Sequence, residues 1–300
     1  MKIQILSKFF LKIQLVVVLV CFSGLLVRAQ KNEHHIEFKI AIEPATDTID
    51  SLRIIHQIPK SLAGRQSISE LIYSVQPSDT FNSGENLYAV FVMKNLGEKA
   101  EISIKFKAEL FKYDLASIKK QKANDIPIEM MPQYLQEEKY IEISNSKIKH
   151  QAQELADHDE QKTIKNIFDF VRNYLYYEGY IAEVKGAAKA FQSKSGDCTE
   201  FADLFVALCR ADSIPARVID GITTSYGNTP LHSWAEVYLQ EFGWVRIDPT
   251  PGQSMTYKSF ENKYLQLSSI RNDPALKYYY RYTYSTWGGK ANVREDVIIN

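Results

Sequence analysis

Hydrophobic and polar residues alternate over several stretches in the first third of the chain. In IEFKIAI, residues 36–42, isoleucine or phenylalanine occupies every second position, and EISIKFKAEL at residues 101–110 repeats this period of two. Residues 52–58 and 86–95 have a similar character, and polar, turn-rich pieces such as QPSDTFNSGEN separate the stretches. Alternation between polar turns is typical of antiparallel strands. We therefore predict a small β-sandwich over residues 30–114 and assign it a packing or adhesion role.

The period of the pattern changes after this region. Residues 115–146 contain two prolines and no regular period, and we interpret them as a connector. Apolar residues then recur at helical spacing, as in Ile164, Ile167 and Phe168. Because further helix-like and strand-like stretches follow in mixed order, we predict a single α+β domain over residues 147–300.

The first 29 residues have the features of a secretory signal peptide. Three lysines stand near the start, an apolar run extends from Ile13 to Val27, and Val27 and Ala29 occupy the positions that a signal peptidase reads. We expect cleavage near Ala29 and a location outside the cytoplasm, either periplasmic or secreted. The alternative is a leader that is retained as a membrane anchor.

Charge and ligand patterns narrow the possible partners. The chain of 300 residues carries 36 basic and 36 acidic residues. A cleaved leader would remove basic residues and no acid, so nothing indicates a basic surface for nucleic acid. No cysteine or histidine pair has zinc spacing and no EF-hand loop is present in the sequence. We therefore expect no metal and no cofactor.

The number and spacing of the cysteines indicate a chemical role for one of them. Once Cys21 leaves with the leader, Cys198 and Cys209 remain, eleven residues apart on one predicted helix. At 1.5 Å per residue their separation is roughly 16 Å, which is beyond the reach of a disulfide. Exported proteins often pair their cysteines, so an unpaired Cys198 favours a chemical role. Cys209, in the middle of the helix, is expected to be a core residue.

The residues around Cys198 place it at the N-terminus of that helix. Asp197 is a good N-cap and Glu200 stands three positions later, which together form the pattern of a capping box. The helix dipole lowers the pKa of a thiol at this position, whereas the two carboxylates act in the opposite sense. The net effect stays open in the sequence, and a cationic partner would decide it. Taken alone, Cys198 would be interpreted as a half-buried structural residue.

Two downstream stretches supply such a partner. In LHSWAEVYL, residues 231–239, alternation places His232, Trp234 and Glu236 on one face, and GWVRIDP places Asp248 on a corresponding face. A hairpin near Gln240 would bring His232 beside Asp248 on neighbouring strands. A histidine oriented by a carboxylate can accept the proton of a thiol.

The three motifs, GDCTEFADLFVALCRADSIPARVIDG, HSWAEVYL and GWVRIDPT, resemble those of the transglutaminase-like superfamily in order and spacing. They cover about Gly196 to Thr250. The resemblance implies a papain-like transglutaminase core, in which the helix that bears the cysteine packs on an antiparallel sheet bearing the histidine and aspartate. It also implies a triad of Cys198, His232 and Asp248. The calcium dependence of animal transglutaminases does not carry over, since their calcium loops are not visible here.

A fourth catalytic element, the donor to an oxyanion, is less defined. The tryptophan that true transglutaminases place upstream of the nucleophile is missing, because all three tryptophans come later in the chain. Gln192 stands six residues before Cys198, the offset at which papain-like enzymes carry their oxyanion glutamine. The alternatives are that Gln192 is a surface side chain and that Tyr176, Tyr177 or Tyr180 donates instead.

Other polar and aromatic residues near the motifs have simpler interpretations. Glu236 is expected to be a solvated strand carboxylate, and Arg217 to make a structural ion pair. Trp234 and Trp244 are expected to pack or to form a wall of the cleft.

The resemblance implies an exported cysteine enzyme that transfers acyl groups from peptide or side-chain amides through a thioester. Hydrolysis, as by a protease or amidase, is our first interpretation, and cross-linking of protein glutamines to amines is the second. A third interpretation is a non-catalytic envelope module in which the β-sandwich binds a partner. We expect a protein or peptide substrate, no nucleic acid, and membrane contact only if the leader is retained.

Overall fold

The computed structural model describes residues 32–118, 132–225, 230–252, 257, 259–277 and 281–300. The expected signal peptide, part of the connector, part of the loop GITTSYGNTPL and the tyrosines at 278–280 lie outside the described residues. Within the described part, no helix has both the length and the apolar character needed to cross a membrane.

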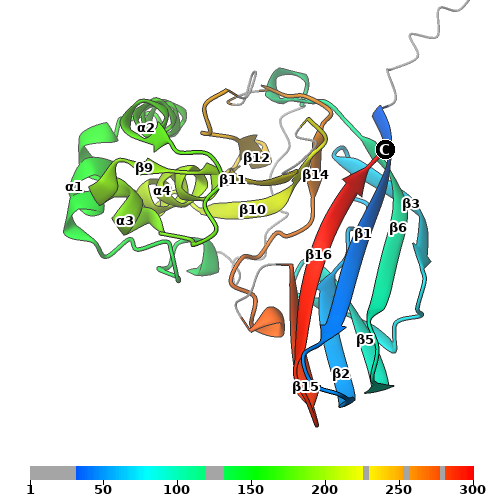
Figure 1. Ribbon diagram of the computed structural model, residues 1–300. Helices are drawn as coiled ribbons and strands as arrows, with labels where there is room; N and C mark the ends of the chain where they lie inside the picture. Colours follow the sequence, from blue (N-terminus) through cyan, green and yellow to red (C-terminus); the bar gives the residue numbers. More distant parts are fainter. Residues whose placement is uncertain (1–31, 119–131, 226–229, 253–256, 258, 278–280) are drawn as a thin grey trace, which may run out of the picture. The chain divides into compact units, whose positions relative to one another are not determined.

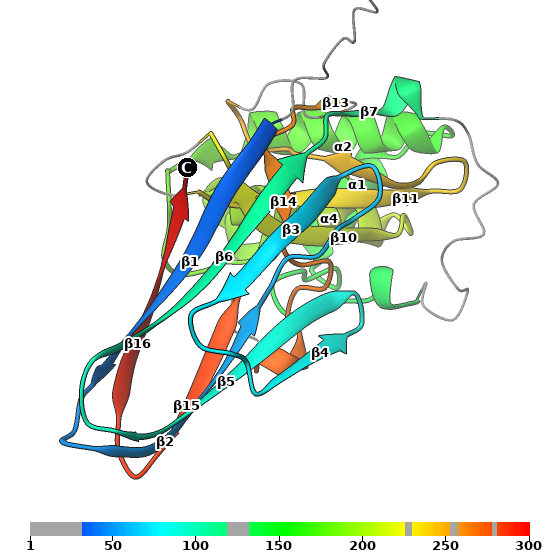
Figure 2. The same cartoon turned by 90° about the vertical axis from the view of Figure 1, so that its right-hand side faces the viewer.

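Two four-stranded sheets form a β-sandwich (Figure 1, Figure 2). The first sheet has the order β16-β1-β6-β3, with strands β16 (Ala291–Ile299), β1 (Asn32–Pro44), β6 (Ala100–Leu110) and β3 (Gln66–Tyr73). The second has the order β15-β2-β5-β4, with strands β15 (Tyr282–Trp287), β2 (Ile49–Gln57), β5 (Asn86–Leu96) and β4 (Asp79–Ser83). The described pairings in both sheets are antiparallel.

The alternating residues of the sequence make the core of the sandwich. Every second side chain of β1 from Ile36 to Ile42 is buried, and so are Ile102, Ile104 and Phe106 of β6. The register places Phe38 opposite Ile104, so that apolar side chains of neighbouring strands face the same interior. The alternating pattern predicted that one face of each strand is buried. This burial of apolar surface stabilises the sandwich.

The C-terminal strands depart from the expected domain division. β15 pairs with β2, and β16 pairs with β1, so both lie in the sandwich rather than in the domain predicted for residues 147–300. The physical reason is that β1 and β2 would otherwise be edge strands with unpaired backbone groups. The two C-terminal strands, one in each sheet, cover these two edges. The other domain boundaries stay predictions.

The remaining part of the chain combines four helices with a third four-stranded sheet. The helices are α1 (Ser146–Leu155), α2 (Glu160–Tyr174), α3 (Ala187–Ser193) and α4 (Cys198–Ala211). The sheet has the order β12-β11-β10-β14, with β12 (Gly243–Ile247), β11 (Leu231–Leu239), β10 (Ala216–Thr223) and β14 (Tyr264–Gln266). Short elements complete the described fold: β7 (Tyr113–Asp114), β8 (Tyr176–Tyr177), β9 (Ser195–Gly196), β13 (Ser259–Phe260) and the 3₁₀ turns Leu115–Ser117 and Pro274–Leu276.

Helix α4 is the centre of this second core. Nearly all of its residues are buried, and it packs against β10 and β11 on one side and against α1, α2 and α3 on the others (Figure 1). A helix that is apolar on all sides is stable only when neighbours surround it. The predicted α+β class, with a cysteine-bearing helix on an antiparallel sheet and a β-sandwich before it, is confirmed.

Candidate active site

The N-terminus of α4 holds Cys198 in a fixed position. The side chain of Asp197 accepts a hydrogen bond from the Thr199 N–H at 2.8 Å, and Glu200 accepts one from the Asp197 N–H at 3.0 Å. These bonds form the predicted capping box. A Cβ at Gly196 would lie 2.3 Å from the Cβ of Glu200, so the box closes only because a glycine precedes it. The second oxygen of Asp197 accepts a hydrogen bond from the Ile181 N–H and anchors the loop before α3.

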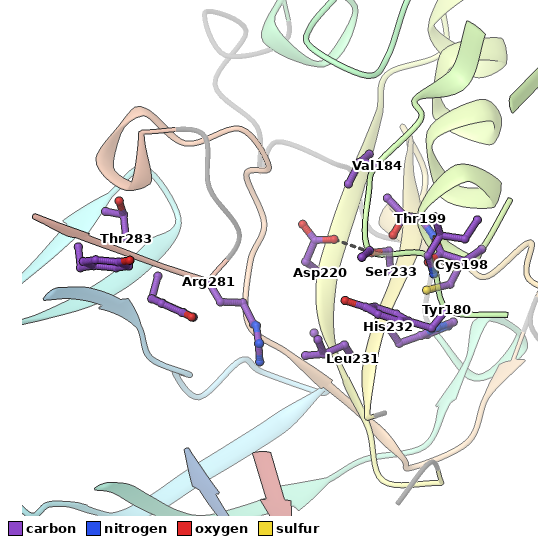
Figure 3. Close-up of a pocket in the computed structure, with 16 residues that line it drawn as sticks. Tyr180, Val184, Cys198, Thr199, Asp220, Leu231, His232, Ser233, Arg281 and Thr283 are labelled. Carbon is purple, nitrogen blue, oxygen red and sulfur yellow. Dashed lines mark hydrogen bonds between the residues drawn. The ribbon is translucent and has the colours of Figure 1, made fainter. Parts of the chain in front are cut away.

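Strand pairing brings the predicted histidine and aspartate together. β11 and β12 form an antiparallel hairpin in which Glu236 faces Arg246, and this register carries His232 and Asp248 to the same end of the sheet. The His232 Nε2–H donates to Asp248 Oδ2 at 2.7 Å. The same imidazole forms a hydrogen bond with the Cys198 side chain. The Cys198 sulfur, the His232 ring and the Asp248 carboxylate are thus linked by hydrogen bonds in this order. Cys198 and His232 lie in one wall of a cavity (Figure 3).

Burial and charge act in opposite directions on His232. Burial lowers the pKa of the imidazole, but the charge of Asp248 and the hydrogen bonds to Asp248 and Cys198 outweigh it and raise this pKa to about 10. The imidazolium in turn holds the pKa of the Asp248 carboxyl below its usual value, against the effect of burial. At neutral pH the pair is therefore an imidazolium and a carboxylate, which is the cationic partner that Cys198 needs.

Tyr264 is a site residue that the sequence analysis missed. Its hydroxyl donates to Asp248 Oδ2 at 2.8 Å, and the Thr250 N–H donates to Asp248 Oδ1 at 3.0 Å. The Tyr264 ring packs edge-on against Trp234, with ring centroids 5.3 Å apart. Tyr264 lies on β14, a strand of three residues, so no periodic pattern marks it. Its contact with Asp248 exists only because β14 pairs with β10.

Glu236 differs from its prediction as a solvated carboxylate. It is fully buried and forms ion pairs with Arg65 and Arg217, which hold the pKa of its carboxyl low although burial opposes this. Arg217 also donates to Glu85 at 2.9 Å, so its predicted structural ion pair is confirmed. The face of β11 that carries His232 and Trp234 packs against Tyr113, Phe260 and Tyr264, and a charge buried on that face must then find a partner. Trp234 is also fully buried and packs, as expected.

A cavity of about 690 Å³ opens beside the thiol. On one side it is lined by Cys198, His232 and neighbouring residues of α4, β10 and β11, and by Tyr180 and the loop that follows it. On the opposite side it is lined by residues 281–284, at the start of β15 (Figure 3). The carboxylate of Asp220 also lines it and accepts a hydrogen bond from the Ser233 hydroxyl at 2.7 Å. A volume of this size is typical of ligand-binding clefts.

Gln192, the expected oxyanion donor, lies elsewhere. Its side chain is exposed on α3, and it is not among the residues that line the cavity. The reason is that α3 ends at Lys194, in the left-handed conformation with φ of 57°, and the chain then runs through β9 before α4 begins. The spacing of six residues therefore does not place Gln192 at the thiol. Of the three alternative tyrosines, Tyr180 lines the cavity, whereas Tyr176 and Tyr177 form β8.

Both cysteines of the described region are free thiols. Cys209 is fully buried, and burial raises the pKa of its thiol well above the usual value. It has the character of a core residue, unlike Cys198, which is partly exposed to the cavity. Within the described ranges, no three histidine, cysteine or acidic side chains are grouped so that they could hold a metal ion.

A cysteine at the N-terminus of a buried helix, packed on an antiparallel sheet that carries a histidine–aspartate pair, defines a papain-like α+β class. Within that class, residues 149–249 match the sequence model of the transglutaminase-like superfamily. The core that holds Cys198, His232 and Asp248 is therefore similar to this superfamily.

Segments of two curated proteins are similar to part of this chain. One segment is 37% identical to the uncharacterized protein YebA of Bacillus subtilis, over 21% of this chain and 10% of that protein. Another comparison gives 36% identity to a protein-glutamine gamma-glutamyltransferase of Pseudomonas aeruginosa, over 20% of this chain and 10% of the relative. The match thus spans about a tenth of the length of these curated relatives.

A solved structure extends the likeness to the rest of the fold. A proposed cysteine protease of Cytophaga hutchinsonii has a TM-score of 0.64 and 19% identity, and the alignment covers 89% of each chain. The similarity therefore includes the β-sandwich as well as the core built around α4. At this identity it shows a shared fold.

Proposed function

We propose that the chain is an exported cysteine enzyme that cleaves peptide or side-chain amides through a thioester, with Cys198 as nucleophile, His232 as acid and base, and Asp248 as the group that orients His232. One observation carries the proposal. A partly exposed thiol at a helix N-terminus bonds to a buried histidine that its aspartate keeps protonated, and thiol and histidine open into the same cavity.

The first half of the reaction forms the thioester. The Cys198 thiolate attacks the carbonyl carbon, a carbon–sulfur bond forms, and the carbonyl electrons move to oxygen. The Cys198 N–H at the start of α4 has no acceptor within the helix and is suited to bind that oxyanion, with Tyr180 as a second donor from the same wall of the cavity. As the oxyanion collapses, the carbon–nitrogen bond breaks and the His232 imidazolium gives its proton to the leaving amine.

The second half releases the acyl group. Water attacks the thioester, the now neutral His232 accepts its proton, and the tetrahedral intermediate expels the Cys198 sulfur. The products are a carboxylic acid and the restored thiolate–imidazolium pair. All groups in this sequence come from the chain, the substrate and water. Hydrolysis is our first choice because water is abundant outside the cytoplasm, the location that the leader sequence supports.

Amine transfer is the second candidate, and two observations favour it. The Pseudomonas aeruginosa relative of this core bears the name of a protein-glutamine gamma-glutamyltransferase. In addition, Asp220 places a carboxylate in the wall of the cavity that contains Cys198, and a carboxylate there is suited to hold the ammonium group of an acceptor amine.

Incubation with a glutamine-containing peptide and dansylcadaverine separates the two reactions. Hydrolysis predicts ammonia or new peptide termini without bound label, whereas amine transfer predicts fluorescent peptide. The Cys198→Ala protein is the negative control, and Cys209→Ala, which alters a core thiol, should keep the activity. If neither product forms, or if Cys198→Ala is as active as the wild type, the enzymatic proposal is wrong.

Labelling with iodoacetamide across pH tests the enzyme against the non-catalytic scaffold. A thiolate stabilised by His232 should react with iodoacetamide well below pH 8.5, the region where an ordinary cysteine begins to ionise. Mass spectrometry of the labelled peptide distinguishes Cys198 from Cys209. Labelling of Cys198 that begins only near pH 8.5 would favour a scaffold whose β-sandwich binds a partner.

A further inference from the structure

The wall of the cavity opposite Cys198 has an unusual composition for a strand. Tyr282, Thr283 and Tyr284 are consecutive in β15, and all three line the cavity. Successive side chains of a strand point to opposite faces of its sheet. A cavity that touches three in a row therefore meets the edge of the strand, where the backbone N–H and C=O groups lie. β15 is also the terminal strand of its sheet among the described residues.

The strand register shows which backbone groups point outward. The Gln57 N–H donates to the Arg281 carbonyl at 2.7 Å, which makes Arg281 and Gln57 a hydrogen-bonded pair of the antiparallel ladder. Hydrogen-bonded and non-hydrogen-bonded pairs alternate along such a ladder. Thr283 therefore bonds to β2, whereas the N–H and C=O groups of Tyr282 and Tyr284 point away from β2. We call the edge that carries these groups the outer edge of β15.

The tyrosine rings at this edge are held in place. The Tyr282 hydroxyl donates to the Val293 carbonyl at 3.0 Å, and the Tyr284 hydroxyl donates to the Ala291 carbonyl at 3.2 Å, both on β16. Tyr284 is 37% exposed, and Tyr180 on the facing wall is 66% exposed. Both walls of the cavity thus present aromatic surface to an occupant.

Buried hydrogen bonds hold the sandwich against the helical core and so fix the distance between this edge and Cys198. Gln66 of β3 donates to the Gln266 carbonyl at 2.9 Å and accepts from the Gln266 N–H at 2.8 Å. Arg217 of β10 bridges Glu236 of its own sheet and Glu85, which precedes β5. The wall formed by β15 is therefore held in a fixed position in the cleft.

We propose that an extended peptide substrate binds as an additional strand along the outer edge of β15 and presents its amide to Cys198. The inference rests on the proposed function and deepens it, because it assigns the substrate to unfolded or extended polypeptide segments. Main-chain hydrogen bonds to a sheet edge accept many sequences, while flanking pockets select side chains. Here Tyr180 and Tyr284 supply the apolar contacts for side chains on either side of the bound strand.

The test uses a tetra-alanine acyloxymethyl ketone, whose methylene carbon next to the ketone forms a bond to the Cys198 sulfur as its bond to the carboxylate oxygen breaks and the carboxylate leaves. We use a series of such probes. Each carries one N-methyl group, at a different alanine, and therefore lacks one backbone N–H. Only alternate residues of an added strand bond to its neighbour. We expect inactivation rates to alternate along the series, with roughly tenfold losses at every second position and small changes between them.

Protein variants localise the effect. Tyr284→Pro removes the outward N–H together with the ring, whereas Tyr284→Ala removes the ring alone. Thr286 is the matched control, because the same alternation turns its N–H outward although it does not line the cavity. Proline is tolerated on an outward position of an edge strand. We expect Tyr284→Pro to react with the peptide probe roughly tenfold more slowly than Tyr284→Ala and to lose the alternation, and Thr286→Pro to match the wild type.

Iodoacetamide separates failure of the two proposals, because it needs the thiolate but no strand edge. Normal iodoacetamide reactivity with no alternation, no capture of the peptide probe, or equal rates for Tyr284→Pro and Tyr284→Ala would overturn the edge proposal and leave the enzyme intact. An unreactive Cys198 toward both reagents would overturn the proposed function and the edge proposal together. If Tyr284→Pro does not fold, the N-methyl series on the wild-type protein still decides.

Discussion

The part of the chain that the structure describes contains two buried histidine–carboxylate pairs with nearly the same geometry. In the helical core, His232 and Asp248 are 2.7 Å apart, with side chains 3% and 0% exposed. In the β-sandwich, His56 and Glu295 are 2.8 Å apart, with side chains 1% and 0% exposed. The difference lies on the far side of each ring. His232 meets the Cys198 thiol and a cavity, whereas the second ring nitrogen of His56 has no hydrogen-bond partner among the described residues.

The comparison shows that a buried histidine–carboxylate pair does not define an active site. Glu295 has a second ionic partner, Arg281, and the three side chains join β2, β16 and the residue directly before β15. That cluster links strands that are distant in the sequence. The pair at His232 has instead a nucleophile on one side, an aspartate with three donors on the other, and open space for a substrate.

The largest expected difference between the two pairs follows from removing each carboxylate charge. Asp248→Asn should lower turnover of a glutamine peptide roughly 10³-fold or more, because burial then lowers the pKa of His232 with no charge to oppose it. Glu295→Gln should leave turnover within a few-fold of the wild type, although it should lower the melting temperature. Equal losses of turnover in both variants would show that the comparison is wrong.

Removing the histidine ring of each pair should change the reactivity of Cys198 by amounts that differ less, but still clearly. In His232→Ala the thiol loses its cationic partner and its hydrogen bond with the imidazole. Alkylation of Cys198 by iodoacetamide at pH 7 should therefore slow by more than about tenfold. His56→Ala should react at the wild-type rate. A slow His56→Ala protein that is still folded by circular dichroism would mean that the sandwich pair also controls the thiol.

Two tyrosine–aspartate hydrogen bonds allow a matched test in which the expected effect on turnover is smaller. Tyr264 donates to Asp248 at 2.8 Å, and Tyr88 donates to Asp273 at 2.8 Å. Tyr264→Phe should slow turnover about tenfold and shift the midpoint of its pH profile, since a hydrogen bond to a carboxylate is lost beside His232. Tyr88→Phe should change stability without moving that profile. If Tyr264→Phe changes only stability, Tyr264 is a packing residue and not a positioning residue.

The smallest expected effect is a pH dependence of stability. The pKa of His232 is raised to about 10 in the folded state, above the value near 6.5 of an unfolded chain. Its contribution to the free energy of unfolding is therefore complete below pH 6.5 and is lost as the pH rises towards 10. Urea unfolding of wild type and His232→Ala should differ most near pH 6 and converge near pH 10. A gap that widens with rising pH would contradict the assigned charge state.

The local features of the molecule could be predicted from sequence because each depends on neighbours in the chain. The alternation in β1 and β6, the capping box at Asp197 and Glu200, and the hairpin that aligns His232 with Asp248 all follow from periods and spacings of a few residues. Those patterns express helix and strand geometry directly. They were sufficient to bring Cys198, His232 and Asp248 into one hypothesis.

Other features depended on which surfaces meet in the folded chain. The C-terminal strands belong to the sandwich because β1 and β2 left open edges, and Tyr264 reaches Asp248 because a three-residue strand joins β10. Gln192 is exposed on α3, and Glu236 is buried in ion pairs with Arg65 and Arg217. No short-range period carries this information, since edge pairing and burial arise between segments far apart in the chain. The sequence thus specified the reacting groups, and the tertiary structure decided what orients them and what encloses them.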